Sequence, residues 1–148
     1  MKEFCYVYYV YYYYEYKAKG VDVPAYVWED VGVYSDGKRA EEAVEKWKQH
    51  RYFCDHPDKF IITRRTCHGA QKTPRMRVYR AVHEHFLPEI VGFQYKRGEF
   101  QALKEAAQAE MEMFRKQAQP DECDTFYVQE FILDEAIPAL QAAEIERK

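Results

Sequence analysis

Thiol and imidazole side chains gather in the middle of the chain, and their chemistry is considered first. Thiolate and imidazole are preferred ligands of zinc. Between positions 50 and 68 the chain carries His50, Cys54, His56, Cys67 and His68. Their spacing, His-x3-Cys-x-His and then an adjacent Cys-His pair, matches no common zinc frame. His83 and His85 share one face of a predicted strand, but two ligands alone make a weak site. We therefore predict no metal centre and no cofactor.

Sequence motifs of catalysis are also missing. The chain has no Gly-rich phosphate loop, no Gly-x-Ser-x-Gly elbow and no His-Glu-x-x-His helix. A Cys/His nucleophile pair needs a thiol of lowered pKa beside an oxyanion site, and spacing identifies neither. We therefore predict a protein that is not an enzyme.

Positive charge is concentrated in one stretch of the sequence. Positions 59 to 80 hold seven basic residues and no acidic one. These residues are Lys59, Arg64, Arg65, Lys72, Arg75, Arg77 and Arg80. Because the net charge of the whole chain is −3, the remainder is strongly acidic and the protein is electrically polarised.

Tyrosine dominates the first predicted strand, over 4–16. Eight of the 14 tyrosines lie between Tyr6 and Tyr16. Alternation along a strand places Tyr9, Tyr11 and Tyr13 on one face, and tyrosine is a frequent recognition residue at protein interfaces. We predict a binding module that presents an aromatic and basic surface to a protein partner. The residues of this surface are Tyr9, Tyr11, Tyr13, Arg64, Arg65, Arg75, Arg77 and Arg80.

The same residues fit a second partner, a single-stranded nucleic acid. Cationic side chains would follow the phosphates while tyrosine rings stack on the bases. The acidic net charge and the missing aromatic consensus of the RNA-recognition fold argue against this alternative. Basic residues on short strands also protect sheet edges from aggregation, which needs no ligand at all.

The elements that carry these residues follow an order that occurs twice. Strands over 4–16 and 26–34, a helix over 38–50 and a strand over 59–65 precede a linker over 66–74. Strands over 76–85 and 89–95, a helix over 98–117 and a strand over 125–133 follow it, and a helix over 134–146 ends the chain. Val31-Gly32 recurs as Val91-Gly92 sixty residues later.

The repeated order predicts an α+β fold of two pseudo-symmetric strand–strand–helix–strand units with mixed sheets. We assign residues 1–66 to the first unit, 75–133 to a second, degenerate unit and 134–148 to the C-terminal helix. At 148 residues, these parts can also form one compact domain. The terminal helix or a sheet edge offers a surface for a homodimer.

Composition indicates the compartment. We see no secretory signal in the first residues, and the longest apolar stretch, from Tyr6 to Tyr14, is too short and too rich in tyrosine to cross a membrane as a helix. The four cysteines are scattered, as is typical of reduced thiols. We expect a cytoplasmic protein without a membrane partner.

Residues 31–62 resemble a family of small uncharacterised domains found in bacteria and phages. The resemblance rests on Gly-x-Tyr-Ser at the end of a strand, Ala-Glu-x-Ala in a helix and a Phe-x-Asp-x-Pro-x-x-Phe loop. The matching residues are Gly32, Tyr34, Ser35, Ala40, Glu41, Ala43, Phe53, Asp55, Pro57 and Phe60. The second half of the chain keeps Gly92 but lacks the other motifs. The setting of the family implies an inhibitor or immunity-type role in a phage or mobile element.

Overall fold

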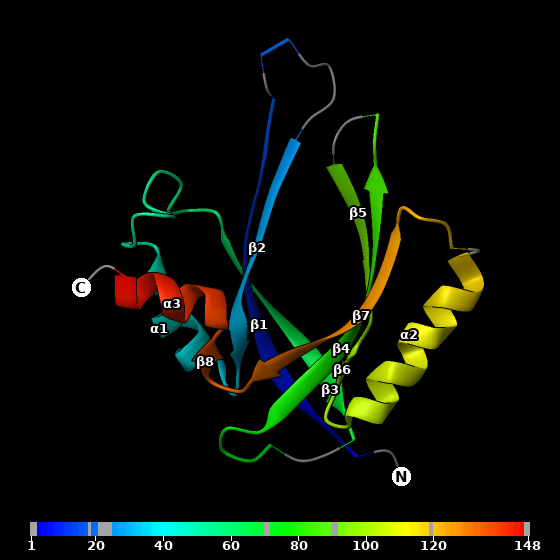
Figure 1. The fold of residues 1–148 in the computed structure, drawn as a ribbon. Coiled ribbons are helices and arrows are strands. Elements are labelled where there is room, and N and C mark those ends of the chain that lie inside the picture. The colour runs from blue at the N-terminus through cyan, green and yellow to red at the C-terminus, as the bar shows by residue number, and fades with distance from the viewer. Residues whose placement is uncertain are drawn as a thin grey trace. The chain divides into compact units, whose positions relative to one another are not determined.

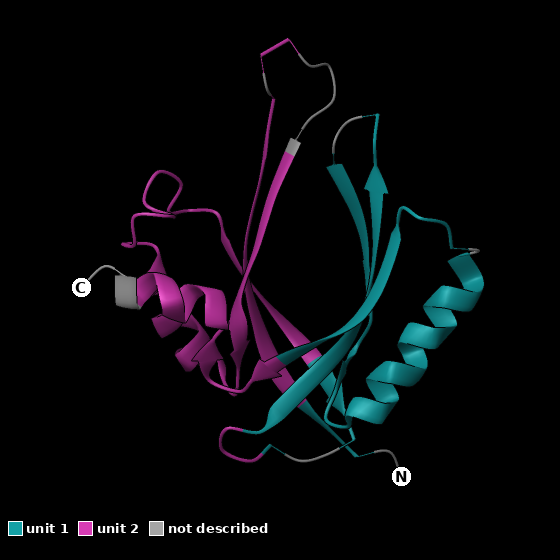
Figure 2. Cartoon of the chain, viewed as in Figure 1, with its two compact units in different colours: residues 1–5, 66–72, 76–130 teal, residues 6–65, 73–75, 131–148 magenta. Residues whose placement is uncertain are grey.

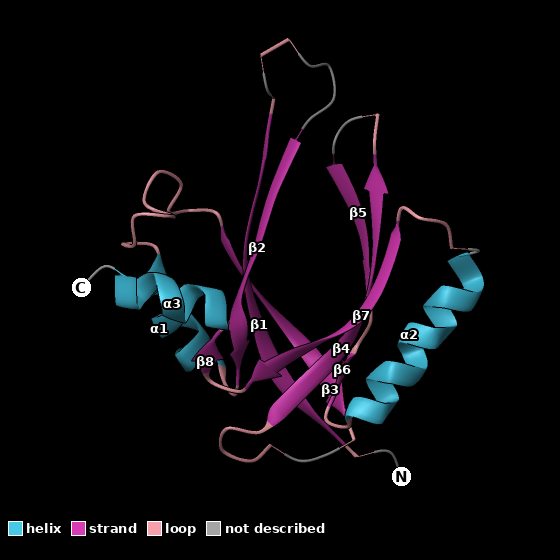
Figure 3. Ribbon diagram, in the orientation of Figure 1, coloured by secondary structure: helices cyan, strands magenta, loops and turns pink. Residues whose placement is uncertain are grey.

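The structure of the protein is a computed structural model that describes residues 3–17, 19–20, 25–69, 72–89, 92–118 and 120–146 (Figure 1). The described residues form eight strands and three helices (Figure 3). In chain order these elements are β1 (Phe4–Tyr16), β2 (Ala25–Tyr34), α1 (Gly37–Trp47), β3 (Phe60–His68), β4 (Arg77–Leu87), β5 (Gly92–Arg97), β6 (Phe100–Gln101), α2 (Lys104–Ala118), β7 (Asp124–Ile132), β8 (Glu135–Ala136) and α3 (Pro138–Glu146). The predicted α+β class, the repeated order of elements and the C-terminal helix are confirmed.

Two compact units divide the chain (Figure 2). Unit 1 consists of residues 1–5, 66–72 and 76–130, and unit 2 of residues 6–65, 73–75 and 131–148. Strands β1, β3 and β7 each contribute residues to both units. The continuous division into 1–66, 75–133 and 134–148 stays a prediction.

Unit 2 is built on the antiparallel hairpin of β1 and β2. Strand β3 lies beside β1, and β8 pairs antiparallel with β2. Helices α1 and α3 lie side by side on one side of β2 (Figure 1), and Lys46 and Glu144 join them through an ion pair of 2.9 Å. The Asp36 carboxylate caps α1 by accepting from the Arg39 N–H at 2.8 Å, as Ser35-Asp36-Gly37 in the sequence predicts.

The core of unit 2 joins the helices to one face of the hairpin. Alternation in β1 sends Val10 and Tyr12 toward α1, where they meet the predicted apolar stripe of the helix. The buried residues of that stripe are Ala40, Ala43 and Trp47. Phe53 and Leu140 complete the cluster from the following loop and from α3.

Unit 1 is built around β4, which pairs antiparallel with β5 and β6 and also pairs with β7. The last residues of β3 pair in parallel with β6, so the sheet is mixed as predicted. Helix α2 packs on β4 (Figure 1) and buries Ala107 and Phe114.

Gly32 has a structural role that the sequence predicts, namely a bulge or a close backbone approach. The pairing of β1 and β2 shifts register between Val10 and Tyr11, opposite Val31. At Gly32 itself, a Cβ atom would lie 2.7 Å from the carbonyl oxygen of Glu135 in β8. Only glycine therefore lets β8 pair with β2 at this point. Gly92 is the first residue of β5, whereas Gly32 lies inside β2, so the two glycines occupy different positions in their strands.

Several predicted boundaries are wrong because short strands replace loop or helix. Helix α2 begins at Lys104 rather than Gly98, since Phe100 pairs with Cys67 as part of β6. For the same reason β3 extends to His68, into the predicted linker. Helix α3 begins at Pro138, because residues 135–136 pair with β2 first. Val91 and part of the predicted turn over 17–24 lie outside the described residues.

Candidate metal centre

Three side chains of unit 1 point their donor atoms at one another. His83 and His85 alternate along β4 and lie on the same face, as the sequence predicts. Asp124 is the first residue of β7, which pairs with β4. The Asp124 Oδ1 lies 2.7 Å from His83 Nε2 and 2.8 Å from His85 Nδ1. The pairing of β4 with β7 therefore creates a group of two imidazoles and one carboxylate.

A tight turn holds the Asp124 carboxylate in place. Its second oxygen accepts a hydrogen bond from the backbone N–H of Asp121 at 2.9 Å. The Asp121 carboxylate accepts in turn from the N–H of Cys123 at 2.7 Å. The backbone hydrogen bond from Asp121 and the hydrogen bonds from the two imidazoles lower the pKa of Asp124 well below its usual range, so the carboxylate is ionised. The side chain is only 6% exposed.

Aromatic packing positions the first imidazole. The His83 ring stacks on Phe126 with centroids 4.4 Å apart and an angle of 10° between the planes. The Arg115 guanidinium of α2 lies 5.1 Å from the centre of the same Phe126 ring. Because Phe126 is two residues after Asp124, β7 supplies both a donor atom and a support for the opposing histidine. Such outer contacts fix the orientation of metal-binding imidazoles.

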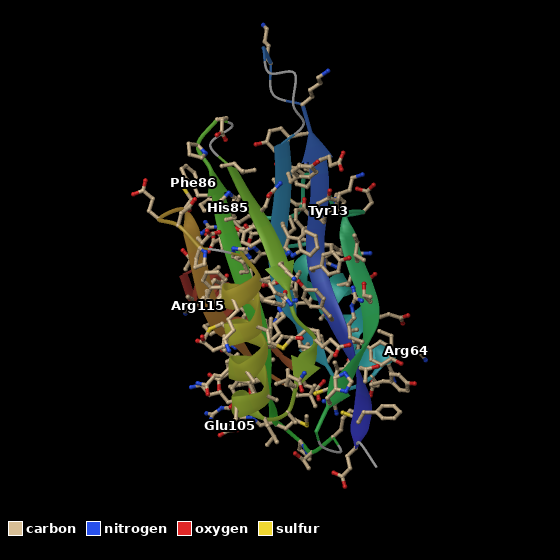
Figure 4. All side chains as sticks on the ribbon, turned by 90° about the vertical axis from the view of Figure 1, so that its right-hand side faces the viewer. Tyr13, Arg64, His85, Phe86, Glu105 and Arg115 are labelled. Atoms are coloured by element: carbon tan, nitrogen blue, oxygen red, sulfur yellow. The ribbon has the colours of Figure 1, made fainter. Side chains whose placement is uncertain are left out.

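A cavity of about 350 Å³ adjoins the three side chains. Besides them, its walls consist of Gln94, Tyr95, Lys96, Ala118 and Asp121. The His85 side chain, 33% exposed, is the most accessible of the three donors, and Figure 4 shows it on β4 beside Phe86. The group of donor atoms is therefore open on one side, with room for water or a small ligand.

The geometry fits a small cation after minor adjustment. The three donor atoms lie within 4.8 Å of one another. Donors bound at about 2.1 Å to one ion lie roughly 3.0–3.4 Å apart, so small rotations of the rings would admit an ion. Without an ion, each imidazole donates an N–H to the ionised carboxylate. A bound cation would replace both protons and leave His83 protonated at Nδ1 and His85 at Nε2.

In the part of the chain that the structure describes, these side chains form the one group of three or more potential metal ligands. The earlier candidates His50, Cys54 and His56 of unit 2 do not form such a group. His50 is buried against Trp47, with ring centroids 5.2 Å apart, and Cys54 is exposed. The His56 ring packs on Tyr14 at 4.5 Å.

Cys67 and His68 of unit 1 have other partners. Cys67 is fully buried, and burial together with the neighbouring Cys5 raises the pKa of its thiol to about 12. A thiol of this kind is a poor nucleophile and a poor ligand, because both roles need the thiolate. His68 Nε2 lies 3.0 Å from the Glu99 carboxylate.

The arginines of the predicted binding surface are dispersed. Arg64 and Arg65 of unit 2 are exposed, and the Arg64 guanidinium lies 4.6 Å from the centre of the Tyr6 ring. Since Tyr6 and Tyr9 alternate, Arg64 is on the face opposite Tyr9, Tyr11 and Tyr13. Figure 4 also shows Arg64 and Tyr13 at separate places along the strands of unit 2.

The other predicted arginines already have partners within the protein. Arg75 pairs with Glu135 at 2.9 Å, and Arg77 pairs with Glu130 at 3.2 Å. Arg80 is 3% exposed and donates to the Gln129 side chain at 2.7 Å. The prediction of Arg80 as a surface residue is therefore wrong, because its side chain is buried and its guanidinium lies 5.3 Å from the centre of the Phe100 ring.

The predicted tyrosines do lie together, in a stacked row. Tyr9 stacks on Tyr11 with centroids 4.7 Å apart, and Tyr11 stacks on Trp28 of β2 at 4.6 Å. Tyr13 contacts Trp28 edge to face at 5.3 Å. Tyr9 is buried and donates its hydroxyl to the Asp30 carboxylate, whereas Trp28 is 37% exposed. We call Tyr9, Tyr11, Tyr13 and Trp28 the aromatic row.

Asp124 is the site residue that the sequence reasoning missed. It follows Pro120-Asp121-Glu122-Cys123, where it reads as one more turn residue. The predicted repeat of elements is the feature of the sequence that could have identified Asp124. Strand β3 lies beside β1 in unit 2, and the equivalent strand of the second succession, β7, pairs with β4. That pairing brings the start of β7 to the His-x-His segment of β4.

Comparison with known proteins adds nothing to this geometry. No protein family, no curated protein and no solved structure matches the chain. The resemblance of residues 31–62 to a bacterial and phage family therefore stays a prediction. Among the described residues, no helix has the length and apolar character needed to cross a membrane.

Proposed function

We propose that the protein binds one divalent transition-metal ion through His83, His85 and Asp124. The observation that carries this proposal is the convergence of two imidazole nitrogens on one half-buried, ionised carboxylate oxygen, at 2.7 and 2.8 Å, beside an open cavity. The proposal departs from the sequence-based expectation of no metal centre, which considered two of these ligands without the third.

The donor types favour particular ions. Imidazole suits Zn²⁺, Fe²⁺, Ni²⁺ and Cu²⁺, whereas Mg²⁺ and Ca²⁺ prefer sites made of oxygen atoms alone. Two histidines and one carboxylate are also fewer than the four ligands of a structural zinc site. An ion held here would keep at least one position open toward the cavity, where Tyr95 and Lys96 lie. The arrangement therefore suits an ion that binds a further small ligand.

Calorimetric titration of protein freed of metal tests the proposal. We expect one Zn²⁺ or Fe²⁺ per chain at micromolar or lower concentration and much weaker binding of Mg²⁺. His83→Gln and Asp124→Asn should each weaken binding by at least about 10-fold. His68→Gln is the matched control, since this histidine pairs with Glu99 and should leave binding unchanged. Equal binding by the wild type and by Asp124→Asn would refute the proposal.

The aromatic row supports a second candidate function, recognition of a protein partner. Its ordered stack ends in exposed rings, Trp28 and the neighbouring Tyr26, which is 57% exposed. Tyr9 and Tyr13 donate their hydroxyls to Asp30 and Glu15, so the row is bordered by acidic groups. Acidic borders repel phosphate, and Arg64 is on the other face. The row therefore fits a cationic protein segment better than a nucleic acid.

Two variants of equal exposure test this second function. Trp28 and Ile62 are both 37% exposed, and Ile62 is on β3, away from the aromatic row. A specific, saturable protein partner should lose at least about 10-fold in affinity with Trp28→Ser and little with Ile62→Ser. A gel shift of single-stranded oligonucleotides that disappears with Trp28→Ser would instead favour the nucleic-acid alternative.

A further inference from the structure

Unit 2 contains a second cavity, of about 360 Å³, which is unrelated to the candidate metal centre. Its floor is formed by directly paired residues of β1 and β2, since Tyr12 lies opposite Glu29 and Tyr14 opposite Val27. Paired residues of two strands point to the same face, so all four side chains are directed into this cavity. The volume is within the range of small-molecule sites.

The walls are aromatic on one side and lined by small residues on the other. Tyr52 and Phe53 enter from the loop after α1, and Phe53 contacts Tyr12 edge to face at 4.7 Å. The opposite wall is α3, which contributes Leu140 and three alanines. Because alanine side chains are short, the helix leaves the space in front of the rings open.

Among the described residues that line this cavity, Glu29 is the one that carries a charge. Within the described residues, its carboxylate has no ion pair and no hydrogen bond. Partial burial, followed by the neighbouring Asp30, raises the pKa of Glu29. An unpaired carboxylate that loses hydration beside aromatic rings is stabilised by a cation.

Other groups around the cavity also favour a cationic ligand. Burial, Tyr14, Asp55 and Asp58 raise the pKa of Tyr12 to about 12, so further negative charge acts on this site. The Arg51 guanidinium makes a cation–π contact with Tyr52, 5.1 Å from the centre of its ring. The positive charge of Lys46, on α1, is balanced by its ion pair with Glu144.

We propose that this cavity binds a small organic cation, an ammonium group with apolar substituents, between the tyrosine rings and the Glu29 carboxylate. The rings of Tyr14 and Tyr52 would contact the substituents and attract the charge through their π faces, above the buried Tyr12. Glu29, whose side chain lines the cavity and keeps contact with solvent, would supply the counter-charge. An anionic ligand is disfavoured by the same carboxylate.

Two probes of the same shape, one charged and one neutral, separate the contribution of the ligand's charge to binding from that of its shape. Choline carries a quaternary ammonium, and 3,3-dimethylbutan-1-ol replaces its nitrogen with carbon and is neutral. We expect the full-length protein to bind choline at least about 10-fold more tightly than the neutral compound in calorimetry or in ligand-observed NMR. Equal binding of the two probes, or no binding of choline at millimolar concentration, would overturn the proposal.

Variants assign the effect to this cavity. Glu29→Gln should remove most of the preference for choline, and Glu42→Gln, an exposed carboxylate of α1, should retain it. Ala142→Leu places a larger side chain on the exposed part of the α3 wall and should weaken both probes. Thermal unfolding checks that each variant is folded. If Ala142→Leu binds choline as the wild type does, the ligand is bound elsewhere and the proposal fails.

Discussion

At the scale of single residues, three positions are tightly constrained by close packing, by burial or by hydrogen bonds. Gly32 has no space for a side chain, Cys67 has no exposure, and Asp124 is held by donors on both of its oxygens. These constraints are local, so each can be tested by one substitution.

Gly32→Ala should destabilise the protein by about 1–3 kcal/mol, because the new Cβ would lie 2.7 Å from the backbone oxygen of Glu135. Chemical unfolding measures the change. Gly37→Ala is the matched control, since a Cβ there would meet the Tyr8 ring at 3.6 Å, an ordinary contact. Equal losses in the two variants would contradict the role assigned to the close approach of β8.

Stability should fall in alkali because buried groups such as Cys67 and Tyr34 resist ionisation. The pKa of the Cys67 thiol rises from 9.0 to about 12 through burial, and that of the Tyr34 phenol rises from 10.0 to about 12 for the same reason. The unfolded chain releases these protons first, so their contribution is complete below pH 9 and is lost as the pH rises toward 12.

Urea unfolding at pH 7.5 and at about pH 10.5 measures this loss, which we expect to be on the order of 2 kcal/mol for Cys67 alone. Cys67→Ala should reduce the pH dependence, although it also lowers stability at neutral pH. Cys54→Ala, at an exposed position, should leave the dependence unchanged. A stability that is constant across this pH range would contradict the assignment.

At the scale of elements, short contacts between distant segments define where helices and strands begin. The turn before β8 is tied to the start of α1 by Asp134, whose φ of 68° lies in the left-handed region. Its carboxylate accepts from the backbone N–H of Ser35 at 2.7 Å and from the Ser35 hydroxyl at 3.0 Å. The sequence suggests a helix from residue 134, but Asp134 instead joins two other elements.

Asp134→Ala should cost about 1–3 kcal/mol, since it removes both hydrogen bonds and leaves alanine in a left-handed conformation. Asp134→Asn should cost less, because asparagine tolerates this conformation and keeps an oxygen acceptor. The ion pair with Arg39, 3.3 Å long and on an exposed side chain, contributes little to either value. Thermal or urea unfolding of the two variants tests the order. If the asparagine variant is the less stable, charge rather than geometry dominates.

At the scale of the whole molecule, the two proposed ligands would act on different units. A metal ion at His83, His85 and Asp124 binds only the folded state and should therefore raise the free energy of unfolding by about 2.7 kcal/mol at a concentration 100 times the dissociation constant. The unfolding temperature should rise as a result. EDTA should reverse the effect, and Asp124→Asn should abolish it.

Hydrogen exchange can show which segments the metal ion stabilises. Protection on addition of metal should be greatest in β4 and at the start of β7, the segments that supply the ligands. Choline should instead protect β1, β2 and α3 of unit 2. Protection by metal that is confined to unit 2 would contradict the proposed centre.

The sequence by itself determined the α+β class, the order of the elements and the faces of the longer strands. Alternation in β4 and the spacing of Ala40, Ala43 and Trp47 in α1 are local properties, and they can be read from adjacent residues. Alternation also grouped Tyr9, Tyr11 and Tyr13. Only the tertiary structure decided which distant strands meet. Pairing of β4 with β7 places Asp124 beside His83 and His85. Arg80 is buried and is therefore not part of the predicted surface. The short strands β6 and β8 occupy residues predicted as helix or loop, so α2 and α3 begin later than predicted. Such contacts join residues far apart in the chain, so no local pattern encodes them, and the candidate metal centre depends on one of them.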